Sequence, residues 1–332
     1  MTYILVDSAN MFFRARHVVR GGDIETKIGM AMHIMFSSIH KAWRDFDGTH
    51  VVFCFEGRSW RKDFYTPYKA HRKEVRDAMT EEQAEEDRLF FEAFDAFKDF
   101  LHEKTNVTVL QAQGCEADDF IARWIQAHPD DQHVIVSSDS DFYQLINEQV
   151  SQYNGIANQH ITLEGIYNDR GKPVVDKKSG EPKRIGDPEW LLFEKCVRGD
   201  TSDNIFSAFP GARKKGTKNK VGMTEAFEDR HKKGYNWNNF LLQTWTDHEG
   251  VEHRVLDDYN RNKTLIDLTS QPDHIKAILD EEIIKAVQAE HKKQVGIHFM
   301  RFCGQHDLVR VGQQADSHTR YLGASYAQRA SG

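Results

Sequence analysis

Short apolar runs alternate with helical patterns through the first half of the chain. Residues 3–6 and 50–55 are β-rich runs, and between them residues 30–46 carry apolar side chains at helical spacing. Residues 107–110 and 134–136 are further apolar runs of strand length, and a helical pattern lies between them. This alternation predicts an α/β fold in which a mostly parallel sheet is flanked by helices.

The rest of the chain is helical or rich in turns. Residues 80–104 begin with Thr-Glu-Glu-Gln, which is typical of a capping box, and carry apolar side chains on one helical face. Residues 152–186 are polar and predict hairpins, while a helical pattern opens at Pro188. We therefore expect an α/β core over residues 1–186, a mostly helical region over 187–311 and a loose polar tail over 312–332.

Composition excludes several classes of protein. The chain is 39% hydrophobic and 29% charged, without an apolar run long enough to span a membrane, so a globular protein is expected. It begins without the pattern of a secretory signal, which favours a cytoplasmic location. The cysteines lack the Cys-x-x-Cys spacing of zinc and redox sites, so we expect reduced thiols; they are Cys54, Cys115, Cys196 and Cys303.

The net charge of −7 hides two basic segments. The first also carries aromatic side chains, and comprises Arg58, Arg61, Lys62, Tyr68, Lys69, Arg72, Lys73 and Arg76. The second comprises Arg213, Lys214, Lys215, Lys218 and Lys220. Basic groups bind phosphates and aromatic rings stack on bases, so both segments are candidate nucleic-acid contacts. A solvated loop is the more frequent explanation of an isolated basic segment, so it is the neighbouring acids that favour nucleic-acid contact here.

Acidic residues gather where the predicted strands end. Asp7 follows the first strand and Glu56 the second, and the carboxyl ends of parallel strands meet at one edge of a sheet. The same edge receives the acids before the next helix, Glu116, Asp118 and Asp119, and those after the run 134–136, Asp139 and Asp141. Helix capping explains an isolated acidic pair, but separate strand ends carrying acids favour a metal site.

Oxygen ligands of this kind suit Mg²⁺, and two such ions can stabilise both the attacking and the leaving oxygen of a phosphodiester displacement. We place Asp7, Glu56, Asp118, Asp119 and Asp139 around a first ion. Glu116 and Asp141 are placed around a second, together with Asp200 and Asp203 further along the chain. Lys69 and Arg72 are the candidate catalytic cations, because a cation near the scissile phosphate offsets developing negative charge.

At this point the sequence resembles the flap endonuclease family of structure-specific 5′ nucleases, most closely its ribonuclease H branch from T-even bacteriophages. The resemblance begins at Asp7 and includes Trp60-Arg-Lys-Asp-Phe64, Tyr68-Lys-Ala-His-Arg72, Glu116-Ala-Asp-Asp119, Ser138-Asp-Ser-Asp-Phe142, Gly199-Asp-Thr-Ser-Asp-Asn204 and Leu265-Ile-Asp-Leu268. A single Asp-x-Asp motif is weak evidence, whereas these motifs occur in the order that the family shows.

The resemblance implies a PIN-like nuclease core, a helical arch over about residues 58–105 and a helix-three-turn-helix module after Asp203. It also implies a monomeric 5′-3′ nuclease with ribonuclease H and flap endonuclease or exonuclease activity, which removes RNA primers during lagging-strand synthesis. The expected cofactor is Mg²⁺, with Mn²⁺ as a substitute. The expected substrates are RNA–DNA hybrids and flap or nicked duplexes, and a single-strand-binding protein and a sliding clamp are the expected partners.

The sequence departs from the family pattern at two places. Glu56 stands where an aspartate is usual, and residues 210–220 replace the usual glycine-rich hairpin and any potassium site there with a basic segment. Two alternatives therefore stay open. One is a PIN-type single-strand ribonuclease, although such domains normally lack both the basic segment before the acids and the downstream helices. The other is a flap-binding protein that has lost catalysis.

Overall fold

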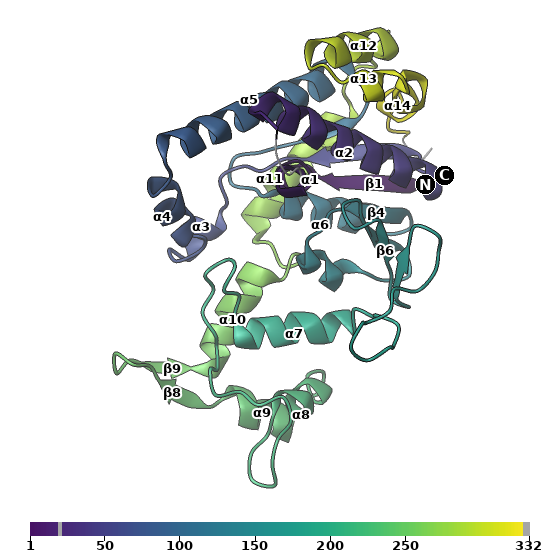
Figure 1. Cartoon of the computed structure of the whole chain (residues 1–332). Coiled ribbons are helices and arrows are strands. Elements are labelled where there is room, and N and C mark those ends of the chain that lie inside the picture. The colour runs from purple at the N-terminus through teal and green to yellow at the C-terminus, as the bar shows by residue number, and fades with distance from the viewer. Residues whose placement is uncertain (19–21, 328–332) are drawn as a thin grey trace. The chain divides into compact units, whose positions relative to one another are not determined.

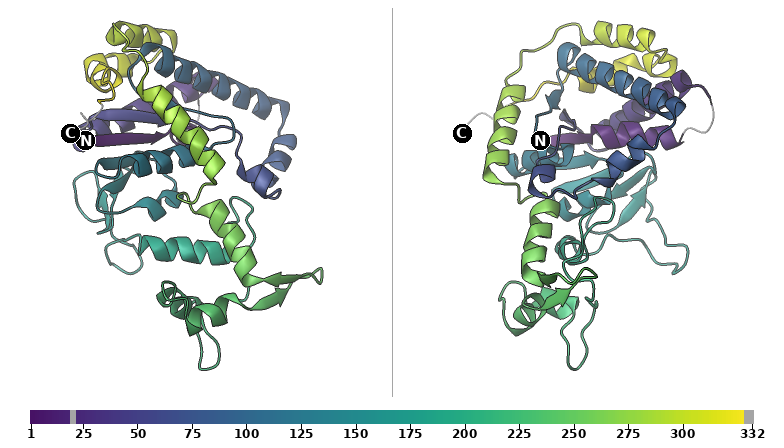
Figure 2. Two further views of the ribbon diagram at one scale, coloured as in Figure 1. Left: turned by 180° about the vertical axis from the view of Figure 1, so that it is seen from behind. Right: turned by 90° about the vertical axis from the view of Figure 1, so that its left-hand side faces the viewer.

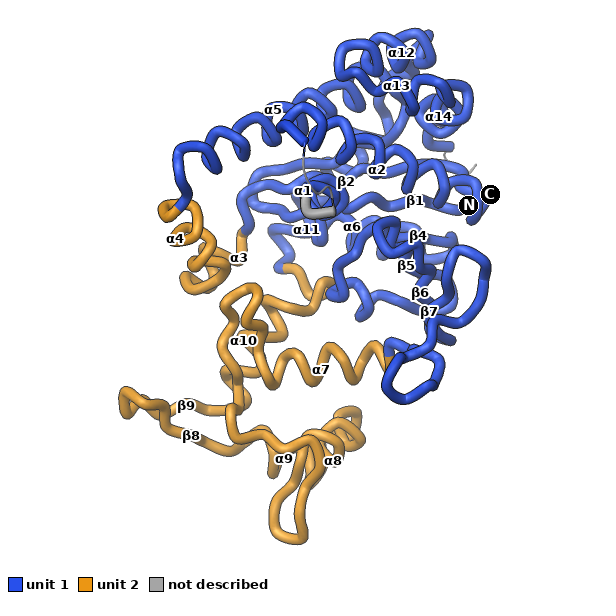
Figure 3. Tube along the Cα trace, in the orientation of Figure 1, with its two compact units in different colours: residues 1–59, 79–185, 272–332 blue, residues 60–78, 186–271 orange. Residues whose placement is uncertain are grey.

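The computed structural model describes residues 1–18 and 22–327, and their contacts divide the chain into two compact units (Figure 3). Unit 1 comprises Met1–Ser59, Met79–Ile185 and Pro272–Gly332, and unit 2 comprises Trp60–Ala78 and Gly186–Gln271. The contacts thus divide the chain at other positions than the sequence pattern does. Among the described residues, no helix combines the length and the apolar character needed to cross a membrane.

A seven-stranded sheet in the order β3-β2-β1-β4-β5-β6-β7 forms the centre of unit 1 (Figure 1). The pairs from β3 to β5 are parallel, while β6 and β7 pair antiparallel as the predicted hairpins. The strands are β1 (Thr2–Asp7), β2 (His50–Cys54), β3 (Thr108–Leu110), β4 (Gln132–Val136), β5 (Val150–Asn154), β6 (Gln159–Ile161) and β7 (Ile166–Asn168). The expected mostly parallel sheet is confirmed.

Helices cover the sheet of unit 1 (Figures 1 and 2). α2 contacts β1 and β4, and α6 contacts β1 and β2. The helices are α1 (Ser8–Val18), α2 (Ile24–Asp45), α5 (Glu81–Lys104), α6 (Ala117–Ala127), the 3-10 helix η1 (Ser140–Leu145), α11 (Asp273–Val287), α12 (Val295–Gln305), α13 (Val309–Gly312) and α14 (Ala315–Leu322). The predicted capping box is present at the start of α5, where Thr80 and Gln83 exchange hydrogen bonds.

The strand order creates a crevice between β1 and β4. The chain leaves β1 towards β2 and β3 on one side, and returns through α6 to β4 on the other side of β1. Connections that diverge from two adjacent parallel strands leave a space at their carboxyl ends, where ligands bind in α/β proteins. Asp7 ends β1, and Val6 pairs with Val136 of β4, so Asp7 and Ser137 meet at this crevice.

The expectation of a loose tail over residues 312–332 is wrong for residues 315–322. Residues 315–322 form α14, in which Tyr321 and Leu322 are fully buried. α14 contacts α2 and α12, and both buried side chains belong to the main hydrophobic core. The polar residues of this tail had hidden a helix with a single apolar face. Residues 328–332 of the expected tail lie outside the described part of the chain.

Unit 2 has its own hydrophobic core, which includes Tyr68, Phe193, Met223 and Tyr259. Its helices are α3 (Arg61–Phe64), α4 (His71–Asp77), α7 (Pro188–Arg198), α8 (Met223–Glu228), α9 (Tyr235–Leu241) and α10 (Val255–Ile266). Strands β8 (Thr244–Thr246) and β9 (Glu252–Arg254) form a hairpin. Trp245 and His253 therefore lie in strands, within a region that the sequence pattern had predicted to be mostly helical. The mostly helical character expected for residues after 186 otherwise agrees with unit 2.

Candidate active site

Asp7 is held in place at the end of β1 by neighbours on both sides. Only 4% of its surface is exposed. Ser137 donates its hydroxyl to Asp7 Oδ2 at 2.8 Å, and the backbone amide of Asn10 donates to Asp7 Oδ1 at 3.2 Å. Hydrogen bonds to both oxygens fix the direction of this carboxylate at the crevice.

The start of α6 brings two more acids to the same edge of the sheet. Glu116 is the N-cap residue, and its backbone amide donates to Asp119 Oδ2 at 2.9 Å. Ser59 donates its hydroxyl to Glu116 Oε2 at 2.7 Å, and both acids are buried. The capping function weighed from the sequence is thus real. It orients two carboxylates at a helix N-terminus, where the helix dipole favours negative charge.

The buried thiol of Cys54 is influenced by acids from three segments. Burial raises the pKa of its thiol well above the usual value, and the negative charges of Asp7, Asp118 and Glu56 raise it further. Asp118 is half-buried, whereas Glu56 is exposed and accepts a 3.4 Å hydrogen bond from the Ala117 amide. The carboxyl ends of β1 and β2 and the start of α6 therefore place their acids around one region of unit 1.

Asp139 and Asp141 follow β4 and are half-buried. Asp139 caps η1 by accepting the Asp141 amide at 3.0 Å, and its own amide donates to Ser137 Oγ at 3.0 Å. Gln152 of β5, fully buried, donates to the carbonyls of Ser137 and Asp139. This network links the segment after β4 to Asp7.

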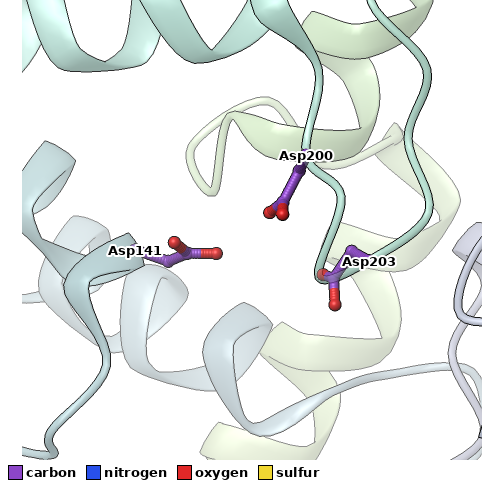
Figure 4. Close-up of side chains that lie close together, drawn as sticks. All are labelled: Asp141, Asp200 and Asp203. Atoms are coloured by element: carbon purple, nitrogen blue, oxygen red, sulfur yellow. The ribbon is translucent and has the colours of Figure 1, made fainter.

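Asp200 and Asp203 extend from the loop after α7 in unit 2, whereas Asp141 belongs to η1 of unit 1 (Figure 4). Asp200 Oδ1 accepts the Ser202 amide at 2.9 Å and the Ser202 hydroxyl at 2.6 Å, and Oδ2 lies 2.7 Å from Lys195 Nζ. Burial raises the pKa of Asp200, but the bonds from Lys195 and Ser202 outweigh it, so the pKa is lowered overall. Asp200 is therefore held as a carboxylate.

Asp203 connects this loop to the first basic segment within unit 2. Its carboxylate lies 3.7 Å from Lys69 Nζ and 3.1 Å from Arg72 Nη2, and it accepts the Tyr68 hydroxyl at 3.2 Å. Lys69 has a left-handed backbone with φ of 52°, and its amide donates to the Asp203 carbonyl at 2.8 Å. The two predicted catalytic cations are thus grouped with one predicted metal ligand.

The other predicted nucleic-acid contacts differ in exposure. Arg61 is only 1% exposed and donates through Nε to the Leu265 carbonyl at 2.8 Å, so the prediction that it contacts phosphate is wrong. Tyr68 is 4% exposed and belongs to the core of unit 2, so its predicted role in base stacking is wrong as well. The remaining candidates are exposed: Arg58, Lys62, Lys73, Arg76, Arg213, Lys214, Lys215, Lys218 and Lys220.

Sequence reasoning missed the polar residues that hold the acids. Ser59, Ser137 and Gln152 contact the acids or their backbone, and Asn262 binds the carbonyls of Cys196 and Phe206 on either side of the loop that carries Asp200. The position of Ser137 directly after a predicted strand was a signal of its importance. Nothing in the sequence pattern connects Gln152 or Asn262 with the site.

Comparison with known proteins agrees with this arrangement. The profile of the 5′-3′ exonuclease N-terminal resolvase-like domain matches residues 2–171. DNA polymerase I of Rhizobium leguminosarum is 30% identical over 239 residues, which cover 68% of this chain but only 20% of that polymerase. The flap endonuclease of Escherichia phage T5 is 26% identical over 206 residues, which cover 61% of this chain and 63% of that enzyme.

A solved structure shares the fold. The T5 D15 protein co-crystallised with metal ions superimposes with a TM-score of 0.57 at 20% identity, covering 86% of this chain and 99% of that protein. An acidic edge on a mostly parallel sheet is thus found here together with the sequence profile of one family. The chain belongs to the flap endonuclease and 5′-3′ exonuclease family.

Proposed function

We propose that this protein is a 5′-3′ nuclease with flap endonuclease and exonuclease activity that hydrolyses phosphodiester bonds with divalent metal ions. The observation that carries the proposal is the set of oriented acids at the carboxyl edge of the sheet in unit 1, with Asp7 held by Ser137 at the end of β1 and Glu116 and Asp119 held at the start of α6. Here like charges lie together at the edge of the sheet where α/β proteins bind ligands.

The residues fit divalent ions in their chemistry. They offer carboxylate oxygens, which suit Mg²⁺ and Mn²⁺, and several of these oxygens are oriented by hydroxyl or amide donors. We propose two Mg²⁺ ions, with Mn²⁺ as a substitute, bound by the acids that the sequence predicted in each unit. Bound ions would lower the pKa of water and offset the charge of the pentavalent transition state.

The protein's own residues supply orientation and positive charge. Ser137 fixes the direction of Asp7 by a bond to one of its oxygens. Lys69 and Arg72 are proposed to contact the phosphate under attack and to offset its growing negative charge. Asp203 lies within reach of both cations, so it restrains them before a substrate binds. Because the two side chains are already held, they lose less conformational freedom when the phosphate binds.

The substrate class and the cellular role are further parts of this proposal. The exposed basic residues of both segments would bind the backbone of flap or nicked duplex DNA and of RNA–DNA hybrids. A related T5 flap endonuclease has been crystallised with DNA and metal ions. We propose ribonuclease H activity and primer removal in lagging-strand replication by a cytoplasmic monomer, with a single-strand-binding protein and a sliding clamp as partners.

Hydrolysis and duplex binding are assigned to different expected domains. We propose that hydrolysis is the task of the α/β core and that the helical region after residue 187 holds the duplex. The exposed lysines at residues 213–220 support the second part, because they project from the helical region. The helical arch expected over residues 58–105 corresponds to α3, α4 and α5, and its function in admitting a single strand stays a prediction.

The test is cleavage of 5′-labelled flap, nicked duplex and RNA–DNA hybrid substrates with Mg²⁺ and with EDTA. We expect short products that require the divalent ion and that disappear in Asp141→Asn. Asp169→Asn, an exposed aspartate on the turn after β7, is the matched control and should cleave normally. Full activity of Asp141→Asn would refute the metal assignment. Cleavage of free single-stranded RNA alone would support the PIN-type alternative, and flap binding without cleavage the binding-protein alternative.

A further inference from the structure

The segment from residue 213 to 224, named here the basic hairpin, has a defined structure within unit 2. Its neck is closed by bonds from the Met223 amide to the Arg213 carbonyl and from the Thr224 amide to the Lys214 carbonyl. Nearer the tip, Thr217 and Lys220 exchange backbone hydrogen bonds. The basic hairpin is therefore an ordered element, although it contains neither a regular strand nor a helix before α8.

A single carboxylate holds the inside of this hairpin. Glu225 Oε1 and Oε2 accept the Gly216 amide at 3.1 and 3.0 Å, and Oε2 also accepts the Gly222 amide at 2.9 Å. Backbone bonds, first to its own amide and then to Gly216 and Gly222, lower the pKa of Glu225 against a smaller opposing effect of burial. Glu225 is thus an ionised anchor between the two sides of the hairpin.

The two glycines permit this close approach. A Cβ atom on Gly216 would lie 2.4 Å from the Lys220 carbonyl oxygen, and one on Gly222 would lie 2.3 Å from the Gly216 nitrogen. Both distances are shorter than any tolerated contact, and the obstructing atoms belong to the backbone. A side chain at either position therefore does not fit between the two sides of the hairpin, and the exposed side chains of Lys215, Lys218 and Lys220 project from a defined base.

We propose that Glu225 is a positioning residue for nucleic-acid binding, which holds the basic hairpin in the shape that presents Lys215, Lys218 and Lys220 to the phosphates of a duplex. The inference rests on the proposed function and deepens it, since it names the acid on which the grip depends. It also accounts for the departure from the family pattern in this segment. A carboxylate inside the loop organises a tip whose lysines remain directed to solvent.

Charge and shape predict opposite effects for Glu225, which makes the proposal testable. Removal of one negative charge beside a cluster of lysines should strengthen binding to DNA if only net charge matters. If the carboxylate holds the hairpin, its removal should weaken binding, because the lysines lose their fixed spacing. Gln and Ala remove the same charge, but Gln retains one oxygen that can accept the two glycine amides. The shape hypothesis therefore predicts that Ala is worse than Gln.

The experiment measures the affinity of the full chain for a labelled nicked duplex in Ca²⁺ buffer over a range of KCl concentrations. We expect Glu225→Ala to bind roughly tenfold more weakly, with the slope of log affinity against log salt reduced by about one or more, and Glu225→Gln to fall between it and the wild type. Glu228→Ala, an exposed acid of the same helix, is the control and should bind at least as tightly as the wild type.

Equal or tighter binding by Glu225→Ala, or equal loss in both variants, would overturn the inference. Thermal unfolding of each variant shows whether weaker binding comes from a changed hairpin in a folded protein or from loss of the fold. If Glu225→Ala unfolds, the test is the affinity of Glu225→Gln compared with that of Glu228→Ala. Equal affinity of these two variants for the nicked duplex refutes the proposal. Wild-type protein that binds no nucleic acid refutes the proposed function itself, and this outcome is distinct from wild-type binding that the variants leave unchanged.

Discussion

Substitution of Asn262 by alanine tests whether the loop that carries Asp200 and Asp203 is fixed from behind. Asn262 lies on α10 and is fully buried. Its Nδ2 donates to the Cys196 carbonyl at 2.9 Å and to the Phe206 carbonyl at 2.8 Å. One amide group thus connects the end of α7 with the far side of the loop. Asn262→Ala removes both of these bonds, together with those that Asn262 Oδ1 accepts from Arg261 Nε at 3.1 Å and Nη2 at 2.9 Å.

The structure sets the size of the effect. The Phe206 carbonyl also accepts a 3.3 Å hydrogen bond from Arg261 Nη2. In the Asn262→Ala variant this carbonyl therefore loses one of its two donors. The Cys196 carbonyl loses a buried donor, and an unsatisfied buried acceptor costs about 1–3 kcal/mol. The space left by the amide adds about 1 kcal/mol. We therefore expect unfolding of unit 2 to become easier by about 2–4 kcal/mol.

Urea unfolding followed by tryptophan fluorescence measures this difference, because Trp190, Trp237 and Trp245 pack against the core of unit 2. Asn260→Ala, at an exposed position of the same helix, is the control and should lie within about 0.5 kcal/mol of the wild type. We also expect cleavage by Asn262→Ala to need more Mg²⁺, because its loop acids are less fixed. A loss below about 0.5 kcal/mol with unchanged Mg²⁺ dependence would refute the reasoning.

Three further perturbations give independent tests. Burial lowers the pKa of His50 and of His133 to about 4, so the fold favours their neutral rings. The free energy of unfolding should therefore be highest above about pH 6.5 and fall as the pH drops towards 4. Urea midpoints at pH 7 and pH 5 measure this difference. Ser137→Ala removes the donor to Asp7 and should cost about 1–3 kcal/mol in EDTA but less in Mg²⁺, as thermal unfolding measures. Arg72→Ala breaks a largely exposed ion pair, so stability should change by less than about 1 kcal/mol while single-turnover cleavage slows roughly 100-fold.

The sequence was most informative where local rules and the fold agree. Strands β1 and β2 were predictable because apolar runs of that length, separated by a helical pattern, can be buried only in a parallel sheet. Placement of Asp7 and Glu56 at one edge then followed from topology, since parallel strands share their carboxyl end. The capping box at Thr80 was predictable because its contacts involve residues only three positions apart.

Contacts that are distant along the chain were beyond such rules. Arg61 is indistinguishable in sequence from the exposed Lys62 beside it, yet it is buried against the Leu265 carbonyl. Trp245 fits a helical pattern, but its ring stacks on His253 at 4.4 Å and its Nε1 donates to the Ala208 carbonyl, which stabilises the β8–β9 hairpin instead. In each case a partner far along the chain determines the position, and no local periodicity contains that information.

Capping and metal binding, which competed as explanations of the acids, are compatible in this structure. Asp7, Glu116 and Asp139 each accept a hydrogen bond from a hydroxyl or a backbone amide. Such donors orient these carboxylates at the sheet edge. Glu56 differs, because it is exposed and its bond from the Ala117 amide is long at 3.4 Å.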